Sequence, residues 1–137
     1  MDRPDLGALF AHVTRRLVDA EGPILADHGL TMWEYVTLSS LGRDDAPTQL
    51  ALARRIRYDK TRLIALLDGL ESRRLVTRRP DPADRRARVV SLTDDGARTL
   101  DATRTDIRAM EEGVLADLDA GDRDALLRVL VRLADPS

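Results

Sequence analysis

The stretch RRPDPADRRARVVSLT, residues 78–93, decides the fold of this chain. Strands are favoured on both sides of its polar middle, because two short β-prone runs lie there: Leu75-Val76-Thr77 just before the stretch and Val89-Val90-Ser91-Leu92 near its end. That segment, residues 80–88, holds two prolines, two aspartates and three arginines. We therefore predict a β-hairpin whose tip is stiffened by proline and rich in arginine.

Three short helices are predicted immediately before the hairpin. Thr31, Thr48 and Asp59 are good N-caps for the helices that follow them, and residues 42–47 form a loop. The third helix carries a leucine stripe at helical spacing, and the second is expected to turn its apolar side chains inward. The stripe consists of Leu63, Leu66, Leu67 and Leu70, and the inward residues of the second helix are Leu50, Leu52, Ala53 and Ile56. The tight turn between these two helices indicates a helix-turn-helix.

Longer helices are predicted at both ends of the chain. The first spans residues 3–28 and ends at Gly29, and Pro23 is expected to kink or interrupt it. After the hairpin, Thr93 caps a helix that reaches about residue 118, and a last helix follows. The last helix is expected to bury Leu126, Leu127, Leu130 and Leu133. Because the terminal helices are too apolar for one small domain to cover, we expect a partner subunit to cover them.

The charge is divided unevenly along a chain whose net charge is -2. Residues 54–88 contain 12 Lys and Arg against 5 Asp and Glu, a net charge of +7, whereas the remainder contains 10 against 19, a net charge of -9. A sharply basic segment in a nearly neutral protein is the footprint expected of a nucleic-acid-binding surface. The alternative interpretation is a solvated charged surface with compensating acids nearby.

The composition excludes several classes of protein. The chain has no cysteine, so disulfides, thiolate zinc sites and thiol redox sensors are excluded. No apolar run is long enough to cross a bilayer and no secretion signal is recognisable, so we expect a soluble, cytoplasmic protein. We expect no metal or other cofactor, because His12 and His28 have no ligand cluster at suitable spacing. A glycine-rich phosphate loop, a nucleophile elbow and an acid–base constellation are missing too, so we expect no enzyme.

The helix after Asp59 and the hairpin together predict a way of contacting DNA. Such a helix fits the major groove, and the hairpin would reach the adjacent minor groove, whose negative potential favours arginine. Asp84 is expected to orient a neighbouring arginine through a bidentate pair. The alternative is that the arginines of the hairpin simply pair with Asp81 and Asp84. Because Arg78 and Arg79 alternate faces on a strand, at most one of them would point at the DNA backbone.

The hairpin and its flanks resemble the wing of the MarR family of transcriptional regulators. The residues that carry the resemblance are Asp84-Arg85-Arg86, Val89-Val90-Ser91-Leu92-Thr93 and Gly96, with Gly29-Leu30-Thr31 and Asp68-x-Leu70-Glu71 upstream. The resemblance covers residues 6–133. It implies a mainly α (α+β) fold, a winged helix-turn-helix with a helical dimerisation layer built from the N- and C-terminal helices.

The resemblance also implies a domain plan, a function and a set of contacts. Residues 1–137 would form one domain, with a DNA-binding lobe at residues 31–92 and dimerisation helices at 1–30 and 93–137. The protein would be a homodimer that binds double-stranded DNA at a palindromic operator, a sequence-specific repressor released by a small aromatic or phenolic ligand. The DNA-binding residues that the resemblance implies are Lys60, Thr61, Arg62, Asp84, Arg85 and Arg86. The placement of the helix face and of the hairpin adds Ile64, Ala65, Arg78 and Arg88 as candidates.

Three features depart from the family pattern. Arg74 stands where the family has glycine, and a non-glycine residue costs about 1 kcal/mol if that backbone is left-handed. Ile64 and Ala65 replace polar residues of the recognition helix, so base readout there would depend on thymine methyl groups, or specificity would be low. Gly69 lies inside a helix, where it costs up to about 1 kcal/mol relative to alanine.

Two questions stay open at the level of sequence. His12, Arg16, Trp33 and Tyr35 are candidates to line a ligand pocket between the dimer layer and the DNA lobe, and the alternative is that Trp33 belongs to the core. The function also has an alternative in another class. A winged-helix dimer could act as a protein-interaction module with weak or non-specific DNA binding, because its recognition helix lacks the usual polar residues.

Overall fold

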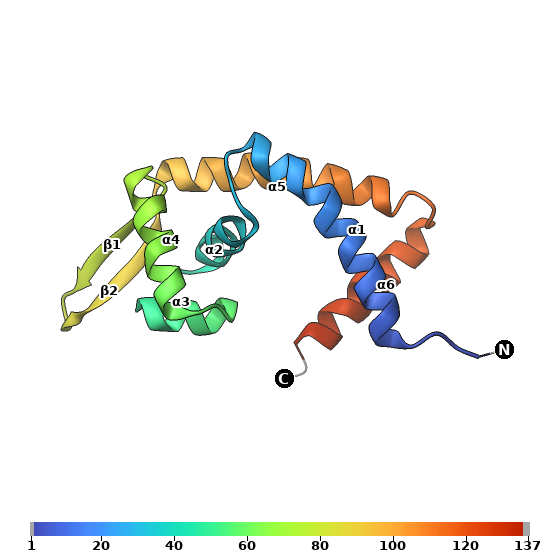
Figure 1. Cartoon of the computed structure of the whole chain (residues 1–137), viewed down its shortest axis with the longest axis horizontal. Coiled ribbons are helices and arrows are strands. Elements are labelled where there is room, and N and C mark those ends of the chain that lie inside the picture. Colours follow the sequence, from blue (N-terminus) through green and yellow to red (C-terminus); the bar gives the residue numbers. More distant parts are fainter. Residues whose placement is uncertain (1, 136–137) are drawn as a thin grey trace.

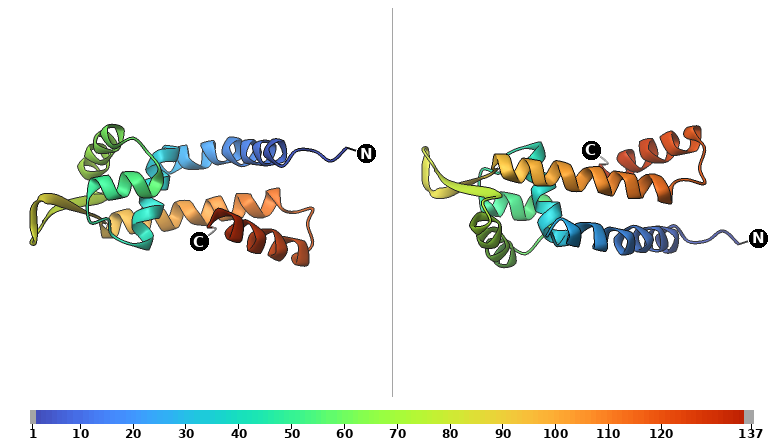
Figure 2. Two further views of the ribbon diagram at one scale, coloured as in Figure 1. Left: turned by 90° about the horizontal axis from the view of Figure 1, so that it is seen from below. Right: turned by 90° about the horizontal axis from the view of Figure 1, so that it is seen from above.

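The computed structural model describes residues 2–135, which form six helices and a two-stranded antiparallel sheet. Figure 1 shows α2, α3, α4 and the hairpin gathered at one end of the long helix α5, and Figure 2 shows α5 running between α1 and α6. The mainly α winged helix-turn-helix predicted from the sequence is confirmed. The elements are α1 (Leu6–Asp27), α2 (Met32–Arg43), α3 (Gln49–Ile56), α4 (Lys60–Ser72), β1 (Val76–Asp81), β2 (Asp84–Leu92), α5 (Asp94–Val114) and α6 (Ala120–Ala134).

The N-caps predicted for α2, α3, α4 and α5 are all present. Thr31 forms a capping box with Glu34, and the Thr48 hydroxyl accepts the N–H of the residue three positions on. Asp59 and Thr93 cap α4 and α5 in the same way. Each cap satisfies a backbone donor that the first helical turn leaves without a partner, so it fixes where the helix begins.

Three helices end in a residue with left-handed backbone. These residues are Gly29, Arg57 and Arg74, with φ angles of 69°, 56° and 62°. After each, an apolar residue donates its N–H to a carbonyl five positions back, which is the Schellman arrangement. The donor and acceptor pairs are Leu30 and Leu25, Tyr58 and Ala53, and Leu75 and Leu70. The backbone at Arg74 is left-handed, so the steric cost stated for a non-glycine residue there applies, and Arg57 has the same strain.

The hairpin is longer than the sequence indicated. Its register runs from Val76 opposite Leu92 to Pro80 opposite Arg88, and a bulge then leads to Asp81 opposite Asp84. The segment predicted as a polar loop is therefore mostly strand, because proline is tolerated on an edge strand such as β1.

A further residue joins the base of the hairpin. Ala46, in the loop before α3, exchanges two backbone hydrogen bonds with Val90 at 3.0 and 2.9 Å. Both residues are fully buried. The loop predicted at residues 42–47 begins only at Asp44, because α2 extends to Arg43. It fixes the hairpin against the helix-turn-helix, since a paired backbone cannot shift without losing both bonds.

The hydrophobic core lies in the lobe formed by α2, α3, α4 and the base of the hairpin. Leu63, Leu67 and Leu70 are fully buried, as the stripe predicted, with Leu66 partly buried against them. The inward orientation predicted for Leu50 is wrong, because its side chain is 38% exposed. It lies about 200° around α3 from the buried Leu52, so burying one exposes the other.

The terminal helices differ from the prediction in two respects. Pro23 does not interrupt α1, which runs unbroken from Leu6 to Asp27. Pro23 has no N–H to donate to the carbonyl of Asp19, four positions back in the helix. Asp19 and Pro23 are both exposed, so a water molecule can bond to that carbonyl instead. Helix α5 ends at Val114, short of residue 118, because the next residues form turns with bonds to carbonyls three positions back.

Helix α6 leaves its apolar side chains uncovered. No residue of α6 is buried, so the prediction that this helix buries its leucines is wrong for the single chain. The N-terminal half of α1 exposes apolar side chains as well. We call the set the terminal apolar residues: Leu6, Leu9, Phe10 and Val13 of α1, and Leu126, Leu127, Val129, Val131 and Leu133 of α6. No helix among residues 2–135 is long and apolar enough to span a membrane.

Candidate DNA-binding interface

The first turns of α4 present an exposed basic surface. Lys60, Thr61, Arg62 and Ala65 are exposed, whereas Ile64 is half-buried. Within the described part of the chain, the side chains of Lys60 and Arg62 form no hydrogen bond or ion pair. The positive end of the helix dipole lies at the same place. The surface is therefore suited to an anion such as a phosphate group.

The tip of the hairpin presents two unpaired guanidinium groups. Arg85 and Arg86 are exposed on β2, and among residues 2–135 neither side chain forms a hydrogen bond or ion pair. The interpretation in which these arginines merely pair with Asp81 and Asp84 is therefore not supported. Two free cations at the end of a projecting hairpin are placed to meet a partner of negative charge.

Asp84 has a different partner from the one predicted. Its carboxylate accepts the backbone N–H of Arg86 at 2.9 Å, and Asp81 accepts the N–H of Ala83 at 2.8 Å in the same way. The predicted bidentate pair between Asp84 and a guanidinium is absent. A short aspartate side chain reaches the backbone N–H two residues on more easily than it reaches a distant guanidinium. Asp81 and Asp84 therefore shape the turn of the hairpin.

Arg88 lies on the same strand with a guanidinium that turns back on its own backbone. Its Nη1 donates to the carbonyl oxygens of Arg85 and Ala87, at 3.1 and 3.3 Å. These bonds occupy Nη1 and leave the other two nitrogens without a bonded partner among residues 2–135. Arg88 therefore braces β2 next to the two free arginines.

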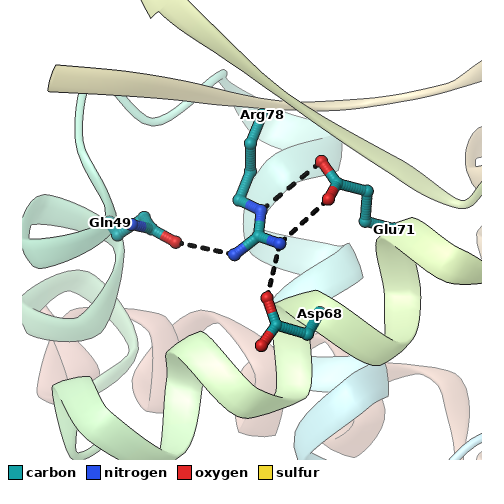
Figure 3. A network of polar contacts seen from close by, with 4 residues as sticks. All are labelled: Gln49, Asp68, Glu71 and Arg78. Carbon is teal, nitrogen blue, oxygen red and sulfur yellow. Dashed lines mark hydrogen bonds and ion pairs between the residues drawn. The ribbon is translucent and has the colours of Figure 1, made fainter.

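Arg78 is the centre of a polar network that joins three elements (Figure 3). Its guanidinium donates to the Gln49 side chain of α3 at 3.1 Å and to the Asp68 carboxylate of α4 at 2.5 Å. Two further bonds reach the two oxygens of Glu71, also on α4, at 2.9 and 3.5 Å. The Arg78 side chain is only 15% exposed, whereas that of Asp68 is 63% exposed.

The electrostatics of this network favour its charged form. The pKa of Glu71 is lowered chiefly by its hydrogen bond with Arg78, and the pKa of Arg78 is raised chiefly by the same bond. A cleft of about 270 Å³ lies beside the network, between the hairpin and the helix-turn-helix, and is lined by Gln49, Glu71, Arg78 and Arg88. On the core-facing side of the hairpin, the cleft is lined by an ion-paired cation, Arg78, and by a partly free one, Arg88.

The residues predicted to line a ligand pocket are only partly brought together. Trp33 is half-buried and stacks on Tyr58, with ring centroids 4.3 Å apart and planes 23° apart. Tyr35 is partly buried against the core. His12 and Arg16 are exposed on α1, and within residues 2–135 no hydrogen bond, ion pair or ring contact joins them to the aromatic residues.

Tyr58 and Gln49 were missed in the sequence analysis. Tyr58 follows the left-handed Arg57, at the position of a Schellman turn that usually packs an apolar side chain, so a signal for it was present. Gln49 had no comparable signal, because its partner Arg78 is distant in sequence. The described residues also contain no group of three or more His, Asp or Glu side chains that could hold a metal ion.

Comparisons with known proteins identify this geometry. A model of the MarR family matches residues 28–87. The HTH-type transcriptional repressor NicR of Pseudomonas putida is 37% identical over 110 residues, which make up 80% of this chain and 69% of NicR. The chain belongs to the MarR family. Membership confirms that it is a winged-helix, DNA-binding transcriptional regulator and not an enzyme.

Solved structures of MarR-family proteins share the fold over nearly the whole chain. The repressor CouR bound to a 23-mer DNA duplex has a TM-score of 0.82 and 28% identity, covering 96% of this chain and 93% of CouR. CouR from Rhodococcus jostii RHA1 bound to p-coumaroyl-CoA has a TM-score of 0.80 and 25% identity, covering 97% and 94%. The apo form of MarR from E. coli, with a TM-score of 0.84 and 22% identity over 98% and 100%, shows the common fold alone.

Proposed function

We propose that this MarR-family protein is a homodimeric transcriptional repressor of the cytoplasm that binds a palindromic operator and is released by a small aromatic ligand. The observation that carries the proposal is the pair of unpartnered guanidinium groups, Arg85 and Arg86, on the hairpin beside the exposed start of α4. A solved relative of the same fold, CouR, is bound to a DNA duplex. The arginines of the hairpin would enter the minor groove and α4 the major groove.

The proposed base contacts come from a short, mostly apolar segment. Thr61 and Ala65 are exposed and Ile64 is half-buried, so their methyl groups would contact thymine methyl groups in the major groove. Lys60, Arg62 and Arg88 would bind phosphates and set the register. Sequence preference would then come from a few apolar contacts and from the shape of the minor groove.

The terminal apolar residues support a homodimer. Val131 is 67% exposed and Leu133 is 63% exposed. Burying such side chains in an interface would stabilise the dimer by about 25 cal/mol for each Å² of apolar surface removed from water. A second copy of the chain would cover α1 and α6 and would place two recognition helices one helical turn of DNA apart. Sedimentation should find a dimer, and Leu127→Asp together with Val131→Asp should yield monomers that bind DNA weakly.

A direct binding experiment separates the repressor from a protein-interaction module. The wild-type protein is titrated with duplex DNA from the region flanking its own gene and with a shuffled duplex of the same length, at several salt concentrations. A repressor binds the first duplex at least about 10³-fold more tightly, with a steep dependence on salt. Equal affinity for both duplexes would instead favour the module with non-specific DNA binding.

The proposed ligand site lies around the stacked pair Trp33 and Tyr58. Tyr58 immediately precedes Asp59, the N-cap of α4, so displacing its ring would move the recognition helix. CouR binds p-coumaroyl-CoA, an aromatic thioester, which supports an aromatic effector here. The ligand would act by binding the DNA-incompetent state more tightly.

Trp33 is the only tryptophan, so its fluorescence reports on the proposed site alone. Phenolic acids and their CoA thioesters are titrated into the protein, with and without DNA. The proposal predicts a compound that changes the fluorescence and weakens operator binding together. Tyr58→Ala should reduce the affinity for that compound, whereas His12→Ala and Arg16→Ala, which lie on α1 away from the stacked pair, should not. If no compound changes both signals, the protein has no such effector among these classes.

A further inference from the structure

We infer that Arg78 is a positioning residue, which sets the angle of the hairpin relative to the recognition helix without contacting DNA. The inference rests on the proposed function, because it concerns how the two DNA-contacting elements are held together. Arg78 belongs to β1, and its three partners belong to the helix-turn-helix, with Gln49 on α3 and Asp68 and Glu71 on α4 (Figure 3).

Four of the five N–H donors of the Arg78 guanidinium are already bonded within the protein, so at most one is left for a phosphate. Nη1 is bonded to Gln49, Nη2 to Asp68 and Glu71, and Nε to Glu71, so all three nitrogens have partners within the protein. The side chain is also largely withdrawn from solvent, at 15% exposed. Arg79 is its opposite, since it is exposed on the other face of β1 and its side chain has no bonded partner within residues 2–135.

Few other contacts fix the outer part of the hairpin. The base is paired with Ala46 through Val90, whereas beyond that pair residues 79, 80 and 82–86 are exposed and Ala87 is buried. Arg78 is thus the outermost residue of β1 with side-chain bonds to α3 and α4. Loss of its bonds would leave the tip attached only through its base, and Arg85 and Arg86 would sample a wider range of positions relative to α4.

The acidic partners of Arg78 allow a test in which the direction of the change in DNA affinity decides the outcome. Removing a carboxylate from a DNA-binding lobe normally strengthens DNA binding, because it removes repulsion of the phosphates. If Glu71 holds Arg78 in place, Glu71→Gln should instead weaken binding. Glutamine replaces one of the two accepting oxygens by an NH2 donor and removes the negative charge that pairs with the guanidinium. The matched control is Asp45→Asn, which removes an exposed carboxylate of the same lobe that has no bonded partner in the described structure.

The experiment measures the operator affinity of Glu71→Gln, Arg78→Lys, Arg79→Ala and Asp45→Asn in the full-length protein. We expect Glu71→Gln and Arg78→Lys to bind about tenfold more weakly, because lysine keeps the charge but lacks the planar fork that holds three partners. Asp45→Asn should bind equally or more tightly. The inference is overturned if Glu71→Gln behaves like Asp45→Asn, or if Arg78→Lys retains the wild-type affinity.

A second measurement tests the inference without DNA. The chain has no cysteine, so Ala83→Cys at the exposed tip of the hairpin accepts a single spin label. Glu71→Gln and Arg78→Lys should each increase the mobility of that label, while Arg79→Ala should not. Unchanged mobility in both variants overturns the inference whatever the DNA data show. If the wild-type protein binds no operator, the proposed function fails, and the label still decides whether Arg78 holds the hairpin.

Discussion

The hydroxyl of Thr93 donates to the carbonyl oxygen of Arg74 at 2.6 Å and accepts the N–H of Gly96 at 2.9 Å. One side chain therefore joins the end of the recognition helix, the end of the hairpin and the start of α5. The N–H of Thr93 adds a bond to the carbonyl of Leu75 at 3.1 Å. Because α5 continues to the far end of the molecule, a movement of the DNA-binding lobe would be transmitted to α5 through this junction.

Thr93→Val should destabilise the protein by about 1–2 kcal/mol, because it removes an N-cap and a second hydrogen bond without changing the shape of the side chain. Thr93→Ser should retain most of the stability. Urea unfolding at one fixed protein concentration measures the difference, since the stability of a dimer depends on concentration. Thr105→Val, whose hydroxyl bonds only within α5, is the matched control. If the two valine variants lower the free energy of unfolding equally, the bonds of Thr93 add no stability beyond that of an ordinary hydroxyl in a helix.

Arg74→Gly should stabilise the protein by up to about 1 kcal/mol. Arg74 has a φ angle of 62°, a left-handed conformation that glycine adopts without the steric cost of a Cβ atom. Arg57→Gly should have a similar effect, because its φ angle is 56°. Arg79→Gly, in the extended backbone of β1, should destabilise the protein and serves as the control. A loss of stability in Arg74→Gly would contradict the strain that we assign to this turn.

Gly69 and Gly96 should respond in opposite ways to replacement by alanine. A Cβ atom at Gly69 meets nothing within 4 Å, so Gly69→Ala should stabilise α4 by about 0.5–1 kcal/mol. A Cβ atom at Gly96 would lie 2.0 Å from the carbonyl oxygen of Leu75, so Gly96→Ala should cost about 1–3 kcal/mol or more. Thermal unfolding of both variants checks the prediction. Similar midpoints for the two would contradict it.

Glu21→Gln should stabilise the protein at neutral pH and have no effect in acid. The pKa of Glu21 is raised above 4.5, first by burial and second by repulsion from Glu111. An acid whose folded pKa is raised penalises folding while it is ionised, and that penalty disappears as the pH falls below its unfolded pKa. The stability gained by the variant should therefore shrink as the pH falls from 7 to about 4. The exposed Asp19→Asn is the control, and a constant difference at all pH values would contradict the assignment.

The local parts of the fold could be predicted because their signals are local. The caps at Thr31, Thr48 and Asp59 each depend on a residue and an N–H three positions on, and the leucine stripe of α4 depends on helical periodicity alone. The wing motif included Thr93 and Gly96, and the structure supplies their physical reasons, a cap and a close approach to Leu75.

The parts that escaped prediction depend on contacts between distant residues. The extension of the strands past Pro80, the pairing of Ala46 with Val90 and the bonds from Arg78 to Gln49 arise only when the lobe has closed. The partner of Asp84 was misjudged for another reason. A backbone N–H two residues away competes better for a short side chain than a flexible guanidinium, and this competition leaves Arg85 and Arg86 free.

The central claim, that the unpaired arginines of the hairpin bind DNA, is tested most directly by the salt dependence of operator affinity for Arg86→Ala. The matched control is Arg108→Ala, on α5 outside the winged-helix lobe. We predict weaker binding for Arg86→Ala and a plot of log affinity against log salt that is flatter by up to about 1, with Arg108→Ala like the wild type. An affinity of Arg86→Ala equal to that of the wild type at every salt concentration would contradict the claim.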